Sequence, residues 1–160
     1  MTCIECGSKM TTKRENFKYD ASGLPGVTLV NVKVSRCLGC GAYEVAIPRI
    51  EQLHEQMAYA VVAKRARLSA PEISFLRRFL GWSGADFAAH LGTTPETASR
   101  WENGRTPMGI QADRLLRSMV VHRSPVEHFE LTLFKEMARD APSPLRARFV
   151  ADRSGWKAAA

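Results

Sequence analysis

The chain has 160 residues, with 23 Lys and Arg against 16 Asp and Glu and a formal net charge of +7. A hydrophobic fraction of 45% with 24% charged residues excludes a largely disordered chain. No apolar run approaches the ~20 residues that span a bilayer, and the first residues lack the apolar segment of a signal peptide. We therefore expect a cytoplasmic protein without a membrane span. Its cysteines are then expected to serve metal or redox chemistry rather than structural disulfides.

The basic excess is distributed along the chain. Residues 1–68 carry a net +4, residues 69–123 carry +2 and residues 124–160 carry +1. This distribution is compatible with nucleic-acid binding and does not establish it, because many basic proteins are simply soluble.

Residues 1–47 have the pattern of a small β-rich module. The β-branched run 27–34 predicts a strand, with 11–19 as the preceding strand and 42–47 as the following one. Turn residues at 22–26 separate the first two strands. A module this short needs a covalent or metal staple to fold.

The four cysteines form two copies of one unit, Cys3-x-x-Cys6-Gly and Cys37-x-x-Cys40-Gly. Two intervening residues let a tight turn direct both sulfurs to one point, and the glycine lets backbone N–H groups face the thiolates. Four sulfurs fill a tetrahedral Zn²⁺ site with no open position, so we expect one structural zinc per chain. Iron in a rubredoxin-like site and a redox dithiol are the alternatives.

Residues 48–123 are helical in pattern. A stripe over 49–67 predicts a connecting helix, with dimerisation as a further role. Ser69, Ser83 and Thr94 are expected to cap three helices that end near Leu80, Leu91 and Asn103. A fourth helix is expected over 110–121, and Pro125 begins a further helical pattern. Beyond it, 145–152 is a candidate strand with Trp156 as its partner across a turn.

The second and third of these helices have the pattern of a helix-turn-helix. Ala88 allows a close helix crossing and Gly92 suits the turn, while Phe87, Leu91, Ala98 and Trp101 form a buried stripe. This segment resembles the Xre/Cro-repressor class, whose recognition helix ends in aromatic-Glu-x-Gly, here at 101–104. The class usually has Gln where this chain has Gly84. A helical bundle for protein contacts is the alternative.

Helical geometry places Glu96, Thr97 and Arg100 on the solvent side of the recognition helix, the one that Thr94 is expected to cap. Arg100 is the first candidate for base readout, because a guanidinium can bind guanine bidentately. Thr97 suits a thymine methyl or a phosphate, and Glu96 suits either cytosine or the helix N-terminus. The remaining candidates for phosphate contacts are Ser83, Thr93, Thr94, Asn103 and Arg105, with Arg77 and Arg78 as either helpers or solvated residues.

Other chemistry is absent from the pattern. The four histidines, His54, His90, His122 and His128, do not cluster at ligand spacing. The sequence has no glycine-rich phosphate loop and no paired catalytic carboxylates. We therefore do not expect an enzyme.

A four-cysteine module followed by an Xre-class domain resembles the MqsA-type antitoxins of type II toxin–antitoxin systems, which carry a YgiT-type zinc finger. The resemblance covers residues 1–47 and about 69–121. It implies a homodimeric repressor that binds a palindromic operator on double-stranded DNA through Arg100 and neutralises a cognate toxin through the zinc module. Glu96 replaces an Asn of that family. A stand-alone Xre-class regulator without a toxin partner is the alternative.

The sequence thus predicts an α+β chain of two separate modules. Residues 1–47 form the zinc module, 48–68 a helical linker, 69–123 an all-α DNA-binding domain, and 124–160 an extension of unknown role.

Overall fold

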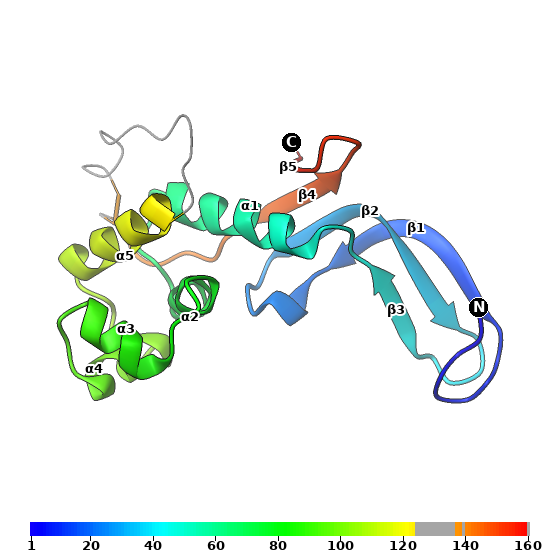
Figure 1. Ribbon diagram of the computed structural model, residues 1–160, viewed down its shortest axis with the longest axis horizontal. Helices are drawn as coiled ribbons and strands as arrows, with labels where there is room; N and C mark the ends of the chain where they lie inside the picture. The colour runs from blue at the N-terminus through cyan, green and yellow to red at the C-terminus, as the bar shows by residue number, and fades with distance from the viewer. Residues whose placement is uncertain (124–136, 139, 160) are drawn as a thin grey trace.

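The computed structural model describes residues 1–123, 137–138 and 140–159 (Figure 1). Within these residues the chain forms an α+β fold with a mixed five-stranded sheet and five α-helices. The strands are β1 (Met10–Lys18), β2 (Val27–Cys37), β3 (Tyr43–Ala46), β4 (Ala147–Ala151) and β5 (Trp156–Ala158). The helices are η1 (Asp20–Ser22, 3-10), α1 (Ile50–Ala63), α2 (Ala70–Phe79), α3 (Gly84–His90), α4 (Pro95–Glu102) and α5 (Ile110–Arg123).

Strand β2 is the centre of the sheet. β1 pairs antiparallel with one edge of β2, from Lys18 opposite Thr28 to Met10 opposite Cys37. The other edge is shared by two strands, since β4 pairs in parallel with residues 27–30 and β3 pairs antiparallel with residues 33–36. β5 pairs antiparallel with β4. The first and last strands of the chain therefore belong to one sheet.

The prediction of two separate modules is wrong. β4 lies beyond all five helices in the sequence, yet it completes the N-terminal sheet by pairing with β2. One hydrophobic core runs from Leu29 in the sheet through Met57 of α1 to Leu76 of α2 and Phe87 of α3. Residues 1–47 are not held by a metal staple alone, because Leu24, Val27 and Leu29 belong to this shared core. Local sequence patterns do not encode a strand pairing across more than 100 residues.

Helix α1 packs in the middle of the molecule rather than serving as a simple linker. Leu53, Met57 and Val61 of the predicted stripe are fully buried, whereas Ile50 at its start is 44% exposed. The helix contacts α2, α5, β4 and β5, and Figure 1 shows it between the sheet and the remaining helices. It ends at Ala63, so Lys64 lies beyond the helix.

The predicted helix caps are confirmed. Ser69 and Ser83 each form a capping box, with Glu72 and Asp86 respectively, and the Thr94 hydroxyl accepts a hydrogen bond from the backbone N–H of Thr97. Gly92 has a φ of 61°, which suits glycine in the turn between α3 and α4. These local signals are why the helix boundaries agree closely with the sequence pattern.

Buried ions hold the segment between α1 and α2. The fully buried guanidinium of Arg117 in α5 lies 2.6 Å from Asp113 and donates hydrogen bonds to the carbonyls of Val62, Lys64 and Ala66. The Asp113 carboxylate also accepts from the backbone N–H of Leu68 at 2.8 Å. This network satisfies the carbonyls near the end of α1, which otherwise have no helical partner.

The predicted C-terminal strand and its partner are confirmed as β4 and β5, in which Ala151 pairs with Trp156. The indole Nε1–H donates to the carbonyl of Pro48, so the last strand is fixed to the start of α1. The helical pattern predicted from Pro125 falls on residues 124–136, outside the described residues.

We expect Arg117→Met to destabilise the protein by about 3–5 kcal/mol, because it leaves the Asp113 charge buried and unpaired. Urea denaturation followed by circular dichroism measures this loss. Replacing both partners (D113L together with R117M) is expected to recover part of the loss. The matched control is Arg146→Met, an exposed arginine whose replacement is expected to stay within about 0.5 kcal/mol. A value for Arg117→Met within that same range would contradict the network's role.

Candidate metal centre and candidate nucleic-acid interface

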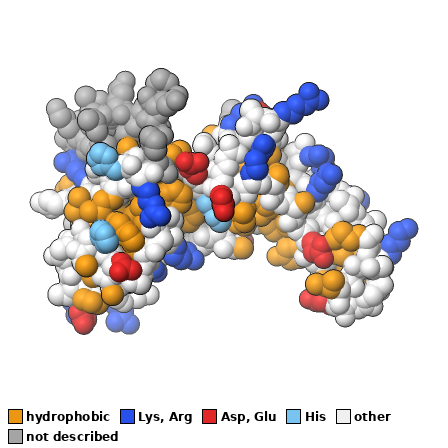
Figure 2. All heavy atoms as spheres, in the orientation of Figure 1, with side chains coloured by type: hydrophobic (Ala, Val, Ile, Leu, Met, Phe, Trp, Pro, Cys, Tyr) orange, Lys and Arg blue, Asp and Glu red, His pale blue; other side chains and the backbone are white. Residues whose placement is uncertain are grey.

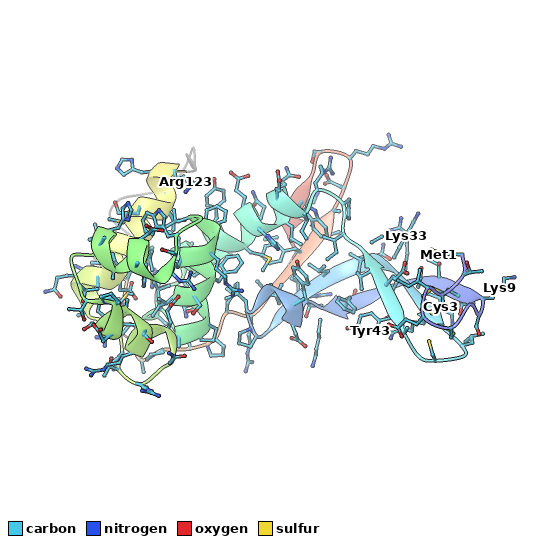
Figure 3. The ribbon with its side chains drawn as sticks, turned by 60° about the horizontal axis from the view of Figure 1, so that its bottom comes forward. Met1, Cys3, Lys9, Lys33, Tyr43 and Arg123 are labelled. Carbon is cyan, nitrogen blue, oxygen red and sulfur yellow. The ribbon has the colours of Figure 1, made fainter. Side chains whose placement is uncertain are left out.

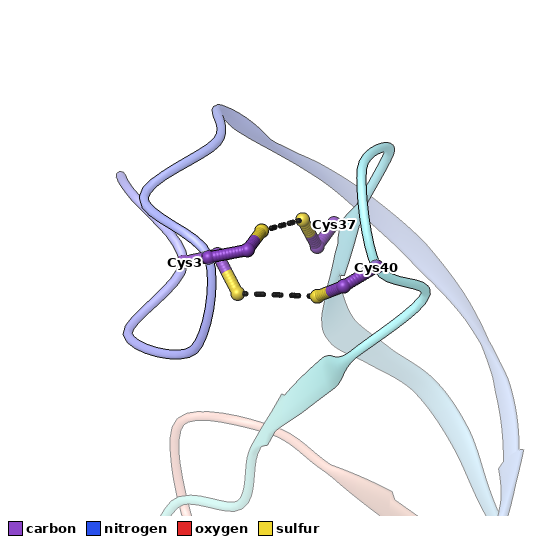
Figure 4. A group of neighbouring side chains, drawn as sticks. Cys3, Cys37 and Cys40 are labelled. Carbon is purple, nitrogen blue, oxygen red and sulfur yellow. Dashed lines mark hydrogen bonds between the residues drawn. The ribbon is translucent and has the colours of Figure 1, made fainter.

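The sulfurs of Cys3, Cys6, Cys37 and Cys40 lie within 4.8 Å of one another, and none of the four cysteines is in a disulfide. The Cys3 and Cys40 sulfurs are 3.6 Å apart, and those of Cys6 and Cys37 are 3.4 Å apart (Figure 4). A tetrahedron with metal–sulfur bonds of about 2.3 Å has sulfurs about 3.8 Å apart. The four predicted ligands therefore converge in a geometry that fits a metal ion.

The two cysteine turns have the same backbone hydrogen bonds. In the first, the N–H of Gly7 donates to the carbonyl of Cys3, and in the second, the N–H of Gly41 donates to the carbonyl of Cys37. Both glycines are left-handed, with φ values of 72° and 77°. This conformation favours glycine and explains why each cysteine pair is followed by one.

Hydrogen-bond donors face the sulfurs. The backbone N–H of Gly39 donates to the Cys37 sulfur at 3.3 Å. Hydrogen bonds from the Ser8 side chain, then from its backbone, lower the pKa of Cys6 to about 6. Such donors stabilise thiolates, which are the form that binds metal.

The sequence interpretation missed the contribution of Ser8. A Cβ added at Gly39 would lie 2.7 Å from the Ser8 hydroxyl oxygen, so the two turns touch through these residues. A glycine inside the second cysteine pair was the available signal of a close approach.

The metal centre lies at the far end of the sheet from the helices (Figures 1 and 3). Cys3, Met10 and Cys37 form a small buried cluster separate from the main core. Ile4 and Leu38 occupy matching positions in the two cysteine turns and are 91% and 81% exposed. A metal ion bound by all four cysteines would have no open coordination position for a substrate.

The α3–α4 pair forms the second candidate site. Phe87 and Ala88 of α3 and Ala98 of α4 are buried, while Leu91 and Trp101 are half-buried against the core. Glu96 and Arg100 are exposed on α4 and Thr97 is half-buried. Among the other candidates, Ser83, Thr94, Asn103 and Arg105 are exposed and Thr93 is half-buried.

Several of these side chains form local hydrogen bonds. The Ser83 hydroxyl is engaged with Asp86, and the Thr94 hydroxyl with Thr97. The Asn103 amide donates to the carbonyl and hydroxyl of Ser99. Side chains that cap a helix in this way use their hydrogen-bonding groups within the protein. They therefore have fewer donors left for a ligand such as DNA.

Glu96 stabilises the start of α4. Its own backbone N–H, then the Thr94 hydroxyl, lower the pKa of its carboxyl group. The sequence allowed two interpretations of Glu96, a contact to cytosine or a negative charge at the helix N-terminus. These hydrogen bonds favour the second.

The Trp-Glu-Asn-Gly sequence that ends α4 has a structural role at each position. Glu102 forms an ion pair with Arg77 of α2 at 2.6 Å, and Arg77 also donates to the carbonyl of Trp82. Gly104 is left-handed, with a φ of 68°. Arg77 therefore connects α2, α4 and the segment before α3.

Comparison with known protein families, curated proteins and solved structures finds no match for this chain. None of the helices in the described ranges is long and apolar enough to cross a membrane.

We expect the purified protein to bind about one metal ion per chain, as a four-thiolate site requires. Cys6→Ser is expected to remove a ligand and abolish stoichiometric binding, measured by elemental analysis. Ile4→Ser is the matched control in the same turn, because Ile4 points to solvent, and it is expected to retain the metal.

Chelation should disorder the cysteine turns and leave α1–α5 folded, because the main core excludes the cysteines. Backbone amide NMR spectra distinguish the two regions. A folded wild-type protein without metal, or global unfolding on chelation, would contradict this assignment.

Proposed function

We propose that this protein is a sequence-specific DNA-binding transcriptional repressor that inserts α4 into the major groove. The observation that carries the proposal is the exposure of two arginine side chains at α4 and just after it. Arg100 and Arg105 are exposed, and neither side chain forms a hydrogen bond or a close ion pair in the described part of the chain. The Arg100 charge interacts electrostatically with the Glu96 carboxylate one turn earlier on α4. Exposed guanidinium groups whose N–H donors are free of protein hydrogen bonds suit the bases and phosphates of DNA.

The helix that carries Arg100 is held rigidly. Thr94 caps its start, Ala98 packs in the core, and the Arg77–Glu102 ion pair holds its end against α2. The two side chains of this pair are largely shielded from solvent, with exposures of 20% and 15%. A rigid helix reads bases at lower entropic cost than a mobile one.

Roles can be assigned from these contacts. Arg100 is the residue for guanine, Thr97 for a thymine methyl, and Arg105 and Thr93 for phosphates. Ser83, Thr94 and Asn103 shape the helix ends. In the proposed complex a homodimer binds a palindrome, as in the Xre/Cro class that the segment resembles.

The proposed metal is zinc with a structural role. Four cysteine ligands with no open position are typical of structural Zn²⁺ sites. Iron would give a rubredoxin-like redox centre, which the elemental analysis distinguishes.

The narrower proposal is that the repressor is an antitoxin, as the resemblance to MqsA-type proteins implies. The exposed Ile4 and Leu38 then give the metal end an apolar contact for the toxin. A stand-alone regulator has no such partner.

We expect Arg100→Ala to lose specific binding to the promoter of the protein's own operon while keeping the fold. One bidentate arginine–guanine contact contributes about 1–3 kcal/mol, or roughly 5- to 150-fold in affinity. Gel shifts with promoter and scrambled DNA measure the loss.

Arg146→Ala is the control, an exposed arginine outside the helices that is expected to bind normally. Footprinting should show two half-sites about 34 Å apart. Equal binding by Arg100→Ala and the wild type would refute the proposed role of α4.

The antitoxin proposal predicts that an adjacent reading frame is toxic when expressed alone and that this protein restores growth. Leu38→Asp is expected to lose the rescue, because a charge interrupts the apolar contact, while retaining metal and promoter binding. Lys9→Asp is a control for a charge change near the same end. A harmless neighbouring frame would leave the repressor proposal intact and remove the antitoxin.

A further inference from the structure

The solvent face of the sheet has a cavity of about 430 Å³ where β3 and β4 end. β4 leaves β2 at Val30 and β3 joins it at Lys33, so Asn31 and Val32 have no strand partner on that edge. Asn31 is left-handed, with a φ of 56°, and the β1–β2 register shifts between Glu15 and Phe17. The irregular backbone opens the sheet at this point.

Two cations lie at the cavity. Arg14 and Lys33 are directly opposite each other on β1 and β2 and both line the cavity. Like charges in this arrangement destabilise a sheet. Both side chains are exposed, and neither has an ion-pair partner in the described residues. Glu44, which lies two pairs further along β3 opposite Ser35, forms no ion pair with Lys33 in the described residues.

The neighbouring walls are apolar. Val30 and Val150 are a direct cross-strand pair, and both are half-buried. Ile47 contributes a third half-buried apolar side chain. The cavity therefore combines an apolar floor with a positive side.

The cavity walls are fixed in place. Trp156 of β5 donates to the carbonyl of Pro48, and Arg49 donates to the carbonyl of Asp152 at 2.8 Å. The ends of β3 and β4 are thus tied together although they are about 100 residues apart in the sequence. Arg14 is also oriented, because its guanidinium donates to the carbonyl of Asn31 at 3.0 Å. Fixed walls lower the entropic cost of binding a ligand.

We propose that this cavity binds a small organic anion, with its carboxylate at Arg14 and Lys33 and its apolar body against Val30 and Val150. A bound carboxylate would offset the repulsion between the two cations, and the apolar walls would bury the body. Cavities of this volume that combine apolar walls with a few polar groups are typical of small-molecule sites. The site is separate from α4, so it does not depend on the proposed DNA-binding function.

The test titrates decanoate, below its micelle concentration, into the full-length metal-loaded protein with labelled valine methyl groups. Saturable shifts of the Val30 and Val150 methyl signals are expected. Lys33→Gln is expected to weaken binding about tenfold or more, as the loss of a charge-assisted contact requires. Arg14→Gln should weaken decanoate binding similarly. Because Arg14→Gln also removes the hydrogen bond to the Asn31 carbonyl, Lys33→Gln is the variant that tests the charge alone.

Lys13→Gln is the matched control. Lys13 precedes Arg14 and lies on the opposite face of β1, and its substitution removes one positive charge, as Lys33→Gln does. It is expected to bind decanoate like the wild type. Decanol and inorganic phosphate test the two halves of the ligand separately, and both are expected to bind weakly. The proposal is overturned if the valine signals do not shift saturably, if Lys13→Gln loses as much affinity as Lys33→Gln, or if decanol or phosphate binds as tightly as decanoate.

Discussion

The buried guanidinium of Arg117 is the constraint on which the rest of the structure depends. It joins α5 to the end of α1 and to the segment that leads into α2, through Asp113 and three backbone carbonyls. A second buried pair, Lys64 with Glu72, acts on the same segment and also caps α2. Short polypeptide segments between helices are ordinarily the most mobile part of a fold. Here the buried ions fix the α2–α5 helices relative to α1 and the sheet.

This connection lies between the two candidate sites. The metal centre lies at the distal end of the sheet, and α4 lies among the helices at the opposite end (Figure 1). The main core between them includes no cysteine. A metal ion bound by the cysteines would therefore stabilise its own end of the sheet, while the orientation of α4 depends on the core and on Arg77 and Arg117. Loss of metal is therefore expected to leave the proposed DNA-binding surface intact.

The sequence predicts those features that depend on neighbouring residues. Helix limits follow from Ser69, Ser83 and Thr94, and the cysteine cluster follows from two identical turns. It does not predict the pairing of β4 with β2, because a five-residue strand matches any exposed strand edge equally well. The cavity depends on the same pairing and on the register that sets Arg14 opposite Lys33. Neither is visible without knowing which strands are neighbours.

The net charge of +7 gives little information about where DNA would bind. All seven basic residues of 69–123 are arginines, and five of them have partners within the protein. Arg117 and Arg123 bind backbone carbonyls, and Arg77 binds Glu102. In Figure 2 the basic side chains are spread over the visible face rather than gathered in one patch. Because partnered arginines serve the fold, the charges available to the proposed DNA-binding surface are those of Arg100 and Arg105. The charges available to the proposed anion site are those of Lys33 and of Arg14, which also donates to the Asn31 carbonyl.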